Sequence, residues 1–463
     1  MPYFPKSEAE NVIKFNPCYP YDPFVGLYNV QFGYVMQPYT FTGWQDETMS
    51  WKKTCYIHAG LYPNPSVRIF GPDCIKLLSD CSTNSHARFP IGRTKHTILT
   101  DELGRIQAHG LTQRVAEEEV WTYSLSPWVN YAATKGNYDV RFEDHSTTDF
   151  NFQTGGPRIL EVLEETTGED LHDIKFMGHR ASSINGKEVR ITRMGMAGTL
   201  AYEVHGNADE APELYRKIVE VGEKYGIRRI GWLSYSLNHT ENGYPQSLAH
   251  FLDSTTEDEG IKKYLSSLGY NTDMWPGVPT LCGSSGQELS KRWRNPVELN
   301  WQNSIGFDHD FPGKAIIEQL YHHPVRKTVT LIWNAEDVME VYASQFRKDE
   351  EPYQYMEFPY GNLHVNVKAG IMNYQDDVFD KDGNLIGSST NRQFTNFTRD
   401  MFSLGVIDIE HTKTGTEVYV LWGDPGTRQK MIRAYVETFP LLAKSMKMNY
   451  EYDVETIPHI HSK

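Results

Sequence analysis

The amino-acid sequence predicts an α+β fold with more than one domain. The clearest helix is expected at 211–225, between Pro212 near its start and Gly226 beyond its end. Its apolar residues fall on one face: Leu214, Ile218, Val221 and Tyr225. Short alternating runs elsewhere predict strands, and such runs prevail after about residue 325. Because 463 residues exceed what one hydrophobic core supports, we expect a separate C-terminal β domain.

The first part of the chain is expected to contain short strands and helices. Residues 1–43 combine Pro, Gly and many aromatic residues without a lasting period, which indicates an irregular arm, and 44–58 are predicted to be a helix. The next elements follow in this order: a strand at 66–70, a short helix at 71–81, a hairpin over 95–115 that turns at 101–104, and a strand at 120–125.

The later part of the chain predicts further strands and sets the domain limits. A strand is expected at 200–204 and another at 230–232, which leads into a loop at 235–245. Strands of the C-terminal domain are expected at 327–333, 404–409 and 416–423. We therefore expect three parts: an arm over 1–43, a domain of two subdomains over 44–324, and a domain over 325–463.

Composition and charge limit the function classes. The net charge of −15 argues against a nucleic-acid partner, because nothing offsets phosphate repulsion. No run reaches the roughly 18 apolar residues that span a membrane, and the first residues show no signal-peptide pattern. The five cysteines are irregularly spaced, which favours reduced thiols and a cytoplasmic location.

The sequence predicts no metal site. It contains neither His-Glu-x-x-His nor Cys-x-x-Cys. Two histidine pairs, His322-His323 and His459-Ile-His461, lack acids at metal-binding spacing, and we expect them at the surface.

The stretch 193–204 has the strongest functional signal. Gly195 to Gly198 predict a flexible loop through which the backbone approaches a flat ligand. Tyr202 and Glu203 follow on a strand and should point to opposite faces. A Glu in an apolar strand needs a partner, either N–H donors of a ligand or a nearby cation such as Arg193.

Several short motifs follow one another along the chain, at residues 56–62, 67–73, 81–84, 92–97, 195–203, 295–301 and 307–314. Their order resembles that of the glycine-cleavage aminomethyltransferase family over nearly the whole chain. The resemblance implies a folate-binding domain of mixed sheets and helices, a C-terminal β-barrel domain, and tetrahydrofolate as the cofactor.

Within that superfamily the chain is similar to tetrahydrofolate-dependent O-demethylases of aryl methyl ethers, the vanillate, syringate and dicamba type. The segments that carry this similarity are 75–80, 116–119, 307–311, 329–334 and 341–346, with the loop around Tyr235. The similarity implies a substrate like a methoxybenzoate, chlorinated ones included. Its methyl group would pass to tetrahydrofolate, giving a phenol and 5-methyltetrahydrofolate.

At three places the sequence departs from these families, and the departures limit the reaction and the substrate that we expect. Gln107-Ala108-His109 stands where the aminomethyltransferase carries paired Asp residues, so glycine cleavage is not expected. Tyr62-Pro63 replaces a His pair of the vanillate-type enzymes, and Leu125 replaces an Arg. The substrate is therefore not expected to be vanillate itself.

The resemblance also implies residue roles. Tyr235 would be the catalytic acid, because the phenolic pKa near 10 matches that of many leaving phenols. His109 has the titration range for proton transfer, although a buried structural histidine is the alternative. Glu203 would anchor the pterin ring through charge-assisted hydrogen bonds, with Gln107, Arg193 and Trp301 as further cofactor-binding residues.

Five more side chains are proposed to line the substrate pocket: Tyr34, Trp44, Tyr62, His239 and Tyr244. For Tyr34, Trp44 and Tyr62 a place in the core is the favoured alternative.

Two other functions remain open. One is S-demethylation of a small sulfonium compound, which should not need the acid Tyr235. The other is a folate-binding protein without turnover, which would bind folate and form no methylated product.

Overall fold

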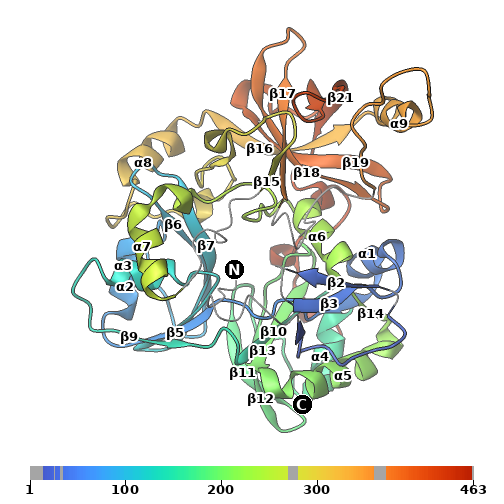
Figure 1. The fold of residues 1–463 in the computed structure, drawn as a ribbon. Helices are drawn as coiled ribbons and strands as arrows, with labels where there is room; N and C mark the ends of the chain where they lie inside the picture. The colour runs from blue at the N-terminus through green and yellow to red at the C-terminus, as the bar shows by residue number, and fades with distance from the viewer. Residues whose placement is uncertain (1–13, 26, 32–34, 270–279, 359–371, 461–463) are drawn as a thin grey trace.

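The computed structural model describes residues 14–25, 27–31, 35–269, 280–358 and 372–460. In this part of the chain the strands form four sheets, and helices lie between and around them (Figure 1). The predicted α+β class is confirmed. The five cysteines are free and buried. Among the described helices, none has the length and apolar character that a membrane crossing requires.

The first large sheet is antiparallel and has the order β6-β7-β8-β5-β9. Its strands are β5 (Ser66–Phe70), β6 (Thr94–Thr100), β7 (Ile106–Ala116), β8 (Glu119–Tyr123) and β9 (Arg141–Asp144). Three helices pack against it around a shared core: α2 (Cys74–Cys81), α3 (Trp128–Ala133) and α7 (Glu259–Ser267). The predicted hairpin is β6–β7, which turns at 101–104, and the strands predicted at 66–70 and 120–125 are also present.

The second large sheet is mixed and has the order β11-β12-β13-β10-β4-β14. Its strands are β4 (Cys55–His58), β10 (Asp149–Gly155), β11 (His179–Ile184), β12 (Lys187–Thr192), β13 (Ala201–Asn207) and β14 (Ile227–Arg229). Helices α4 (Ile159–Thr167) and α5 (Ala211–Gly222) cover one face. The predicted helix at 211–225 is α5 followed by a 3-10 turn, and it ends at Gly226 with φ 74°.

The C-terminal strands form a closed barrel. The seven strands are β15 (Thr280–Cys282), β16 (Arg326–Trp333), β17 (Met372–Phe379), β18 (Leu385–Thr395), β19 (Asp400–Asp408), β20 (Glu417–Trp422) and β21 (Lys430–Glu437). Pairing of β17 with β20 closes six of them into a ring, and β15 adds to β17. Two helices, α8 (Lys314–His322) and α9 (Ala335–Ser344), precede and interrupt the barrel strands. The three strands predicted beyond residue 325 are present.

The helix predicted at 44–58 is wrong in its second part. Helix α1 covers Trp44–Lys53, and residues 55–58 form the fully buried strand β4. A short apolar run such as Cys55-Tyr56-Ile57 fits a buried strand as well as a buried helix, so periodicity alone does not separate them. The strand is fixed by its partners β10 and β14.

The loop predicted at 235–245 is wrong for most of its length. Residues Trp232–Glu241 form helix α6, and nearly all its side chains are buried. A helix that is buried all round has no amphipathic stripe, so its sequence gives no helical period.

The arm over 1–43 is more regular than expected. Strands β1 (Lys14–Phe15), β2 (Leu27–Gln31) and β3 (Val35–Thr40) form a three-stranded sheet. Pro38 lies within β3, and a proline inside a run usually argues against a strand. Pro38 therefore argued against a strand at 35–40 in the sequence.

Candidate active site

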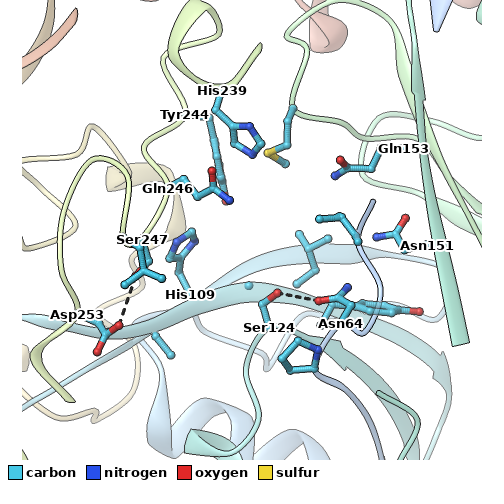
Figure 2. Close-up of a pocket in the computed structure, with 18 of the residues that line it drawn as sticks. Asn64, His109, Ser124, Asn151, Gln153, His239, Tyr244, Gln246, Ser247 and Asp253 are labelled. Carbon is cyan, nitrogen blue, oxygen red and sulfur yellow. Dashed lines mark hydrogen bonds between the residues drawn. The ribbon is translucent and has the colours of Figure 1, made fainter. Parts of the chain in front are cut away.

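A cavity opens where the two large sheets meet helix α6. Its wall comprises side chains from β7, β10, β13 and α6, together with the loops 61–65 and 244–253. Figure 2 shows His239, Tyr244 and Gln246 on one side of it, Asn151 and Gln153 on another, and His109 between them and Asp253. Segments far apart in the sequence therefore meet at one site.

Glu203 is buried at this wall and has two neighbours that the sequence did not reveal. Gln153 Nε2 donates to Glu203 Oε1 over 3.0 Å, and His205 Nε2 lies 3.2 Å from Glu203 Oε2. Glu203 Oε2, Gln153 Oε1 and Asn151 Oδ1 are all buried, and none has a hydrogen-bond partner among the described residues. The wall thus presents a group of unsatisfied acceptors, which suits a ligand with several N–H donors.

Tyr235 projects from α6 into the same site. Its ring stacks on His58 at 4.1 Å between centroids, and Trp232 and His239 meet it edge-on. Burial, followed by the nearby Tyr56 and Glu203, raises the pKa of Tyr235 well above 10, although a hydrogen bond with Gln153 opposes the shift. Tyr235 is therefore a protonated phenol at neutral pH.

Gln153 joins the two sequence-predicted residues. It donates to Glu203 and also hydrogen-bonds Tyr235, so one amide contacts both the buried acid and the phenol. Gln153 belongs to no recognisable motif, so it could not be identified as a site residue from the sequence.

His109 and Gln107 line the cavity from alternate positions of β7. Burial holds the pKa of His109 well below 6.5, and His96 lies 3.3 Å from its Nδ1. His109 is therefore neutral at physiological pH, which favours the structural alternative over proton donation. Gln107 Nε2 donates to Asp258 over 3.0 Å.

His239 and Tyr244 both lie at the wall, and Trp301 stands behind them. Burial lowers the pKa of His239 to about 4, so this histidine is also neutral. Trp301 packs against His109 at 4.8 Å and Tyr244 at 5.7 Å between ring centroids. Trp301 thus supports wall residues, but it is not part of the wall among the described residues.

Three other predicted residues, Arg193, Trp44 and Tyr62, are placed elsewhere. Arg193 donates to the carbonyl groups of Asn449 and Tyr452, at 3.0 and 2.8 Å, and does not pair with Glu203. Trp44 packs edge-on against Phe358 and Phe394 in front of the barrel. The Tyr62 hydroxyl donates to the carbonyl of Thr147, and Tyr34 lies outside the described residues.

The loop 244–253 supplies wall residues that sequence reasoning missed. Asp253 is buried and accepts from Ser247 Oγ at 3.3 Å and from the Thr255 amide at 3.2 Å. Leu248 in the same loop has φ 73°, an unfavourable conformation for a residue with a side chain. Such strained residues collect at functional sites, but the sequence gives no sign of them.

The far end of the wall is polar and neutral. Ser124 Oγ donates to Asn64 Oδ1 over 3.3 Å, and Ser124 has φ 61°. Both side chains are shown at the foot of the cavity in Figure 2.

Helix α6 is held at both ends by buried acids. Glu47 of α1 accepts from the Gly231 amide and from Ser234 Oγ at the start of the helix. At its end Glu241 forms an ion pair with Lys52, 2.6 Å apart, and both side chains are 1% exposed. These contacts fix the helix that carries Tyr235 and His239.

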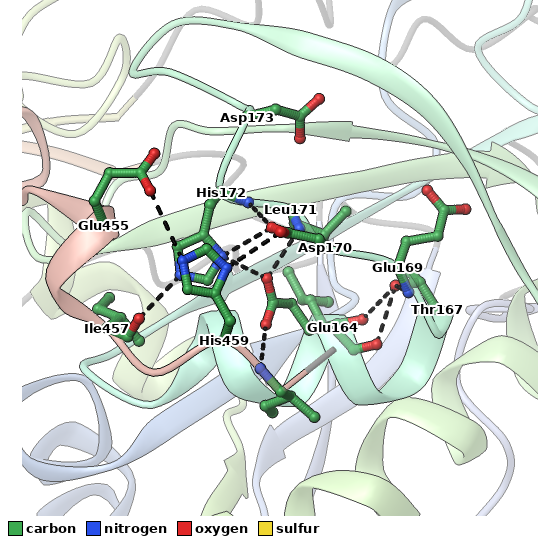
Figure 3. A network of polar contacts seen from close by, with 12 residues as sticks. Glu164, Thr167, Glu169, Asp170, Leu171, His172, Asp173, Glu455, Ile457 and His459 are labelled. Atoms are coloured by element: carbon green, nitrogen blue, oxygen red, sulfur yellow. Dashed lines mark hydrogen bonds and ion pairs between the residues drawn. The ribbon is translucent and has the colours of Figure 1, made fainter. Parts of the chain in front are cut away.

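A second polar cluster lies away from the cavity, between α4 and residues 455–460 (Figure 3). Asp170, His172 and His459 bring one potential metal-ligand atom each to within 4.8 Å of one another. However, His172 contacts Glu164 and Asp170 through Nδ1 and the Ile457 carbonyl through Nε2. With both nitrogens engaged as donors, His172 acts as a cation that holds the tail.

Three comparisons place this geometry among known proteins. The sequence pattern described as the GCVT N-terminal domain matches residues 27–260. The chain is 36% identical to the sesamin methylene transferase of Sinomonas sp. (strain No.22), covering 92% of this chain and 94% of that protein. It is 28% identical to the syringate O-demethylase of Sphingobium sp. (strain NBRC 103272 / SYK-6), covering 87% of both chains.

The fold has a counterpart among solved structures. The glycine cleavage system aminomethyltransferase T from Bartonella henselae superposes with a TM-score of 0.67 over 95% of this chain and 99% of that one, at 16% identity. This likeness concerns the fold, including the C-terminal barrel.

Proposed function

The chain belongs to the GCVT N-terminal domain family, and on that premise we propose that it is a tetrahydrofolate-dependent demethylase of aryl methyl ethers. It would move the methyl group of the ether to tetrahydrofolate and release a phenol. One observation carries the proposal: Glu203, Gln153 and Tyr235 form a continuous set of contacts on one cavity.

The wall fits the cofactor. A reduced pterin presents an amino group and ring N–H groups, and the unpaired oxygens of Glu203, Gln153 and Asn151 are acceptors for such donors. Tetrahydrofolate supplies, when bound, the nitrogen nucleophile for the one-carbon group. Glu203 and Gln153 would hold the pterin, and the apolar wall residues would exclude water from the reacting atoms.

Tyr235 would serve the leaving group. Its pKa is raised by burial, so its hydroxyl keeps its proton at neutral pH and donates a hydrogen bond to the ether oxygen. As the phenolate forms, the same hydroxyl stabilises the developing charge through this hydrogen bond. Gln153 orients it for that step. His109 would remain neutral and serve as a packing residue.

A second substrate chemistry is favoured by one comparison. The 36% identity to a methylene transferase, along 92% of the chain, suggests cleavage of a methylene bridge held by two aryl oxygens. The same phenol at Tyr235 would serve each leaving oxygen in turn. This reaction would deliver a methylene group in place of a methyl group to the cofactor.

One assay separates these reactions. Purified protein is incubated anaerobically with tetrahydrofolate and a panel of methoxy and methylenedioxy aromatic compounds, and the folate products are identified by mass spectrometry. 5-Methyltetrahydrofolate from a methoxy compound supports demethylation, whereas methylenetetrahydrofolate from a bridged compound supports methylene transfer. Folate binding with no product from either class, or product from a sulfonium donor alone, contradicts both.

A further inference from the structure

The charge of the cavity wall bears on the class of substrate. The wall has two carboxyl groups, Glu203 and Asp253, and both are buried. Its two histidines, His109 and His239, are neutral because burial lowers their pKa. The other described wall residues are uncharged, so the described part of the wall offers a substrate acids, amides, hydroxyls, rings and aliphatic groups, and no cation.

Asp253 shows how the surroundings of the cavity wall affect the ionisation of a carboxyl group. It accepts hydrogen bonds from Ser247 Oγ and from the Thr255 amide, which favour its ionised form. Burial nevertheless raises the pKa of Asp253 above its ordinary value. A carboxylate on a substrate would meet the same desolvation, with Asp253 as a neighbour of like charge.

The polar groups of the wall suit neutral oxygen substituents. Asn64 and Ser124 at the foot of the cavity, and Gln246 beside Tyr244, bring amide and hydroxyl groups that bind ether or hydroxyl oxygens (Figure 2). Rings of Trp128, Tyr244 and Phe251 supply flat apolar surface around them.

From this wall we infer that the one-carbon donor is an uncharged aromatic ether, not a methoxybenzoate. The inference rests on the proposed function and narrows it to a substrate class. It also replaces the carboxylated substrate that the resemblance to the vanillate-type enzymes implies.

The test compares compounds that differ in charge alone. Dimethoxybenzamide and dimethoxybenzoate have nearly the same shape, as do the carboxamide and the carboxylate of benzodioxole. For each pair, kcat/KM is measured with tetrahydrofolate, and the dissociation constant is measured by calorimetry with folate at saturation. We expect each amide to exceed its acid by about 100-fold in at least one quantity, the scale of an unpaired buried charge.

Turnover and binding together keep the two conclusions separate. Equal or better use of the acids, or tighter binding of the acids, overturns the inference and leaves the proposed function intact. Selective binding of the amides without any folate product supports the inference and contradicts the proposed function. Failure of all four compounds to bind overturns the inference.

A pair of variants at one wall position sharpens the test. Gln246→Lys brings a cation to the wall and should raise the acid-to-amide ratio of kcat/KM by about two- to fivefold, the range for a screened ion pair. Gln246→Met, of similar length and without charge, should leave that ratio near the wild-type value. An equal change of the ratio in both variants would mean that wall charge does not select the substrate.

Discussion

Tyr235 keeps its proton because its surroundings oppose a negative charge. The ring is buried against His58, and Glu203 lies near enough to raise its pKa further. A phenol with a raised pKa is a weak acid, so it stays protonated and acts as a persistent hydrogen-bond donor. That property suits the departure of a phenolate.

Replacement of Tyr235 by Phe should therefore lower kcat by roughly 10²–10⁴-fold, the usual contribution of a positioned proton donor. Because the ring and its stacking on His58 remain, the dissociation constant of tetrahydrofolate should stay within a factor of about three. Tyr244→Phe is the matched control, since it removes a second cavity phenol. Full activity of Tyr235→Phe, measured as folate product formed per time, would remove Tyr235 from the mechanism.

Glu203 should matter for binding more than for rate. Glu203→Gln keeps the size of the side chain and removes the charge, so charge-assisted hydrogen bonds to the pterin become neutral ones. We expect the folate dissociation constant to rise about tenfold or more, and kcat at saturating folate to change less. Calorimetric titration measures the first quantity. An unchanged constant would place the pterin elsewhere in the cavity.

The sequence predicted part of the site at this scale. Glu203 was identifiable because an acid in an apolar strand needs a partner, and Tyr235 because it matches a family position. Gln153, Asn151 and Asp253 were not, since polar residues of these types occur throughout the chain and only the fold brings them together. Arg193 was misplaced because its partners, Asn449 and Tyr452, lie more than 250 positions away in sequence.

At the scale of elements, helix α6 depends on the ion pair between Lys52 and Glu241. Both side chains are almost fully buried, and Glu241 also accepts from Trp51 Nε1 at 3.0 Å and from Thr395 Oγ1. The pair joins α1, α6 and the barrel strand β18. The ion pair fixes the position of α6 more than it adds to the net free energy of unfolding.

Removal of one partner should be costly. Glu241→Gln leaves the Lys52 ammonium buried without a counter-charge, and we expect the free energy of unfolding to fall by about 3–5 kcal/mol. Lys52→Met in the same chain removes the remaining charge and should recover most of the loss. Chemical denaturation of the single and double variants measures both. If the double variant is as unstable as Glu241→Gln, the buried charge is not the cause.

The errors in the predicted elements share a physical origin. Strand β4 and helix α6 are buried on all sides, so neither has the alternation or the amphipathic stripe by which elements are recognised. Half-exposed elements such as α5 and the β6–β7 hairpin were predicted correctly. The complete burial that fixes β4 and α6 beside the cavity therefore also makes these elements hard to recognise from the sequence.

At the scale of the whole molecule, residues 441–460 return from the barrel to the second large sheet. Arg193 holds Asn449 and Tyr452, and the Asn449 amide donates to the carbonyl of Gly198 at 2.7 Å. Met196, two residues before Gly198, belongs to the cavity wall. The segment therefore supports the loop between Gly195 and Gly198 from outside.

The His172 cluster makes this attachment sensitive to pH. Burial tends to lower the pKa of His172, but hydrogen bonds with the Ile457 carbonyl, Glu164 and Asp170 outweigh it and raise the pKa above 6.5. A histidine with a raised pKa stabilises the folded state below its unfolded pKa, and this contribution disappears as the pH rises through the folded pKa.

The wild-type protein should therefore exceed His172→Gln in free energy of unfolding most clearly near pH 6, and the difference should shrink toward pH 9. Denaturation followed by circular dichroism at several pH values measures it. His322→Gln is the control, because that histidine lies at the exposed end of α8. A difference that stays constant or grows with pH would contradict a charged His172.

The overall class and the barrel were predictable, because strand patterns survive in half-exposed strands and the family order of motifs covers the chain. The path of residues 441–460 was not predictable, since it depends on single hydrogen bonds across the molecule. His459, expected as a surface residue without acid partners, stacks on His172 at 3.7 Å, and its acid neighbours are Asp170 in the loop after α4 and Glu455 in its own segment.

The position of residues 441–460 also determines when their contacts can form during translation. The ribosome delivers these residues after all the barrel strands, although their partners Arg193 and His172 emerge far earlier. Contacts that span so much sequence form late and slow the folding of the chain. Until then the Arg193 guanidinium stays hydrated and the glycine loop beside the cavity lacks its outer support. The loop between Gly195 and Gly198 therefore gains its outer support only after the barrel strands have been translated.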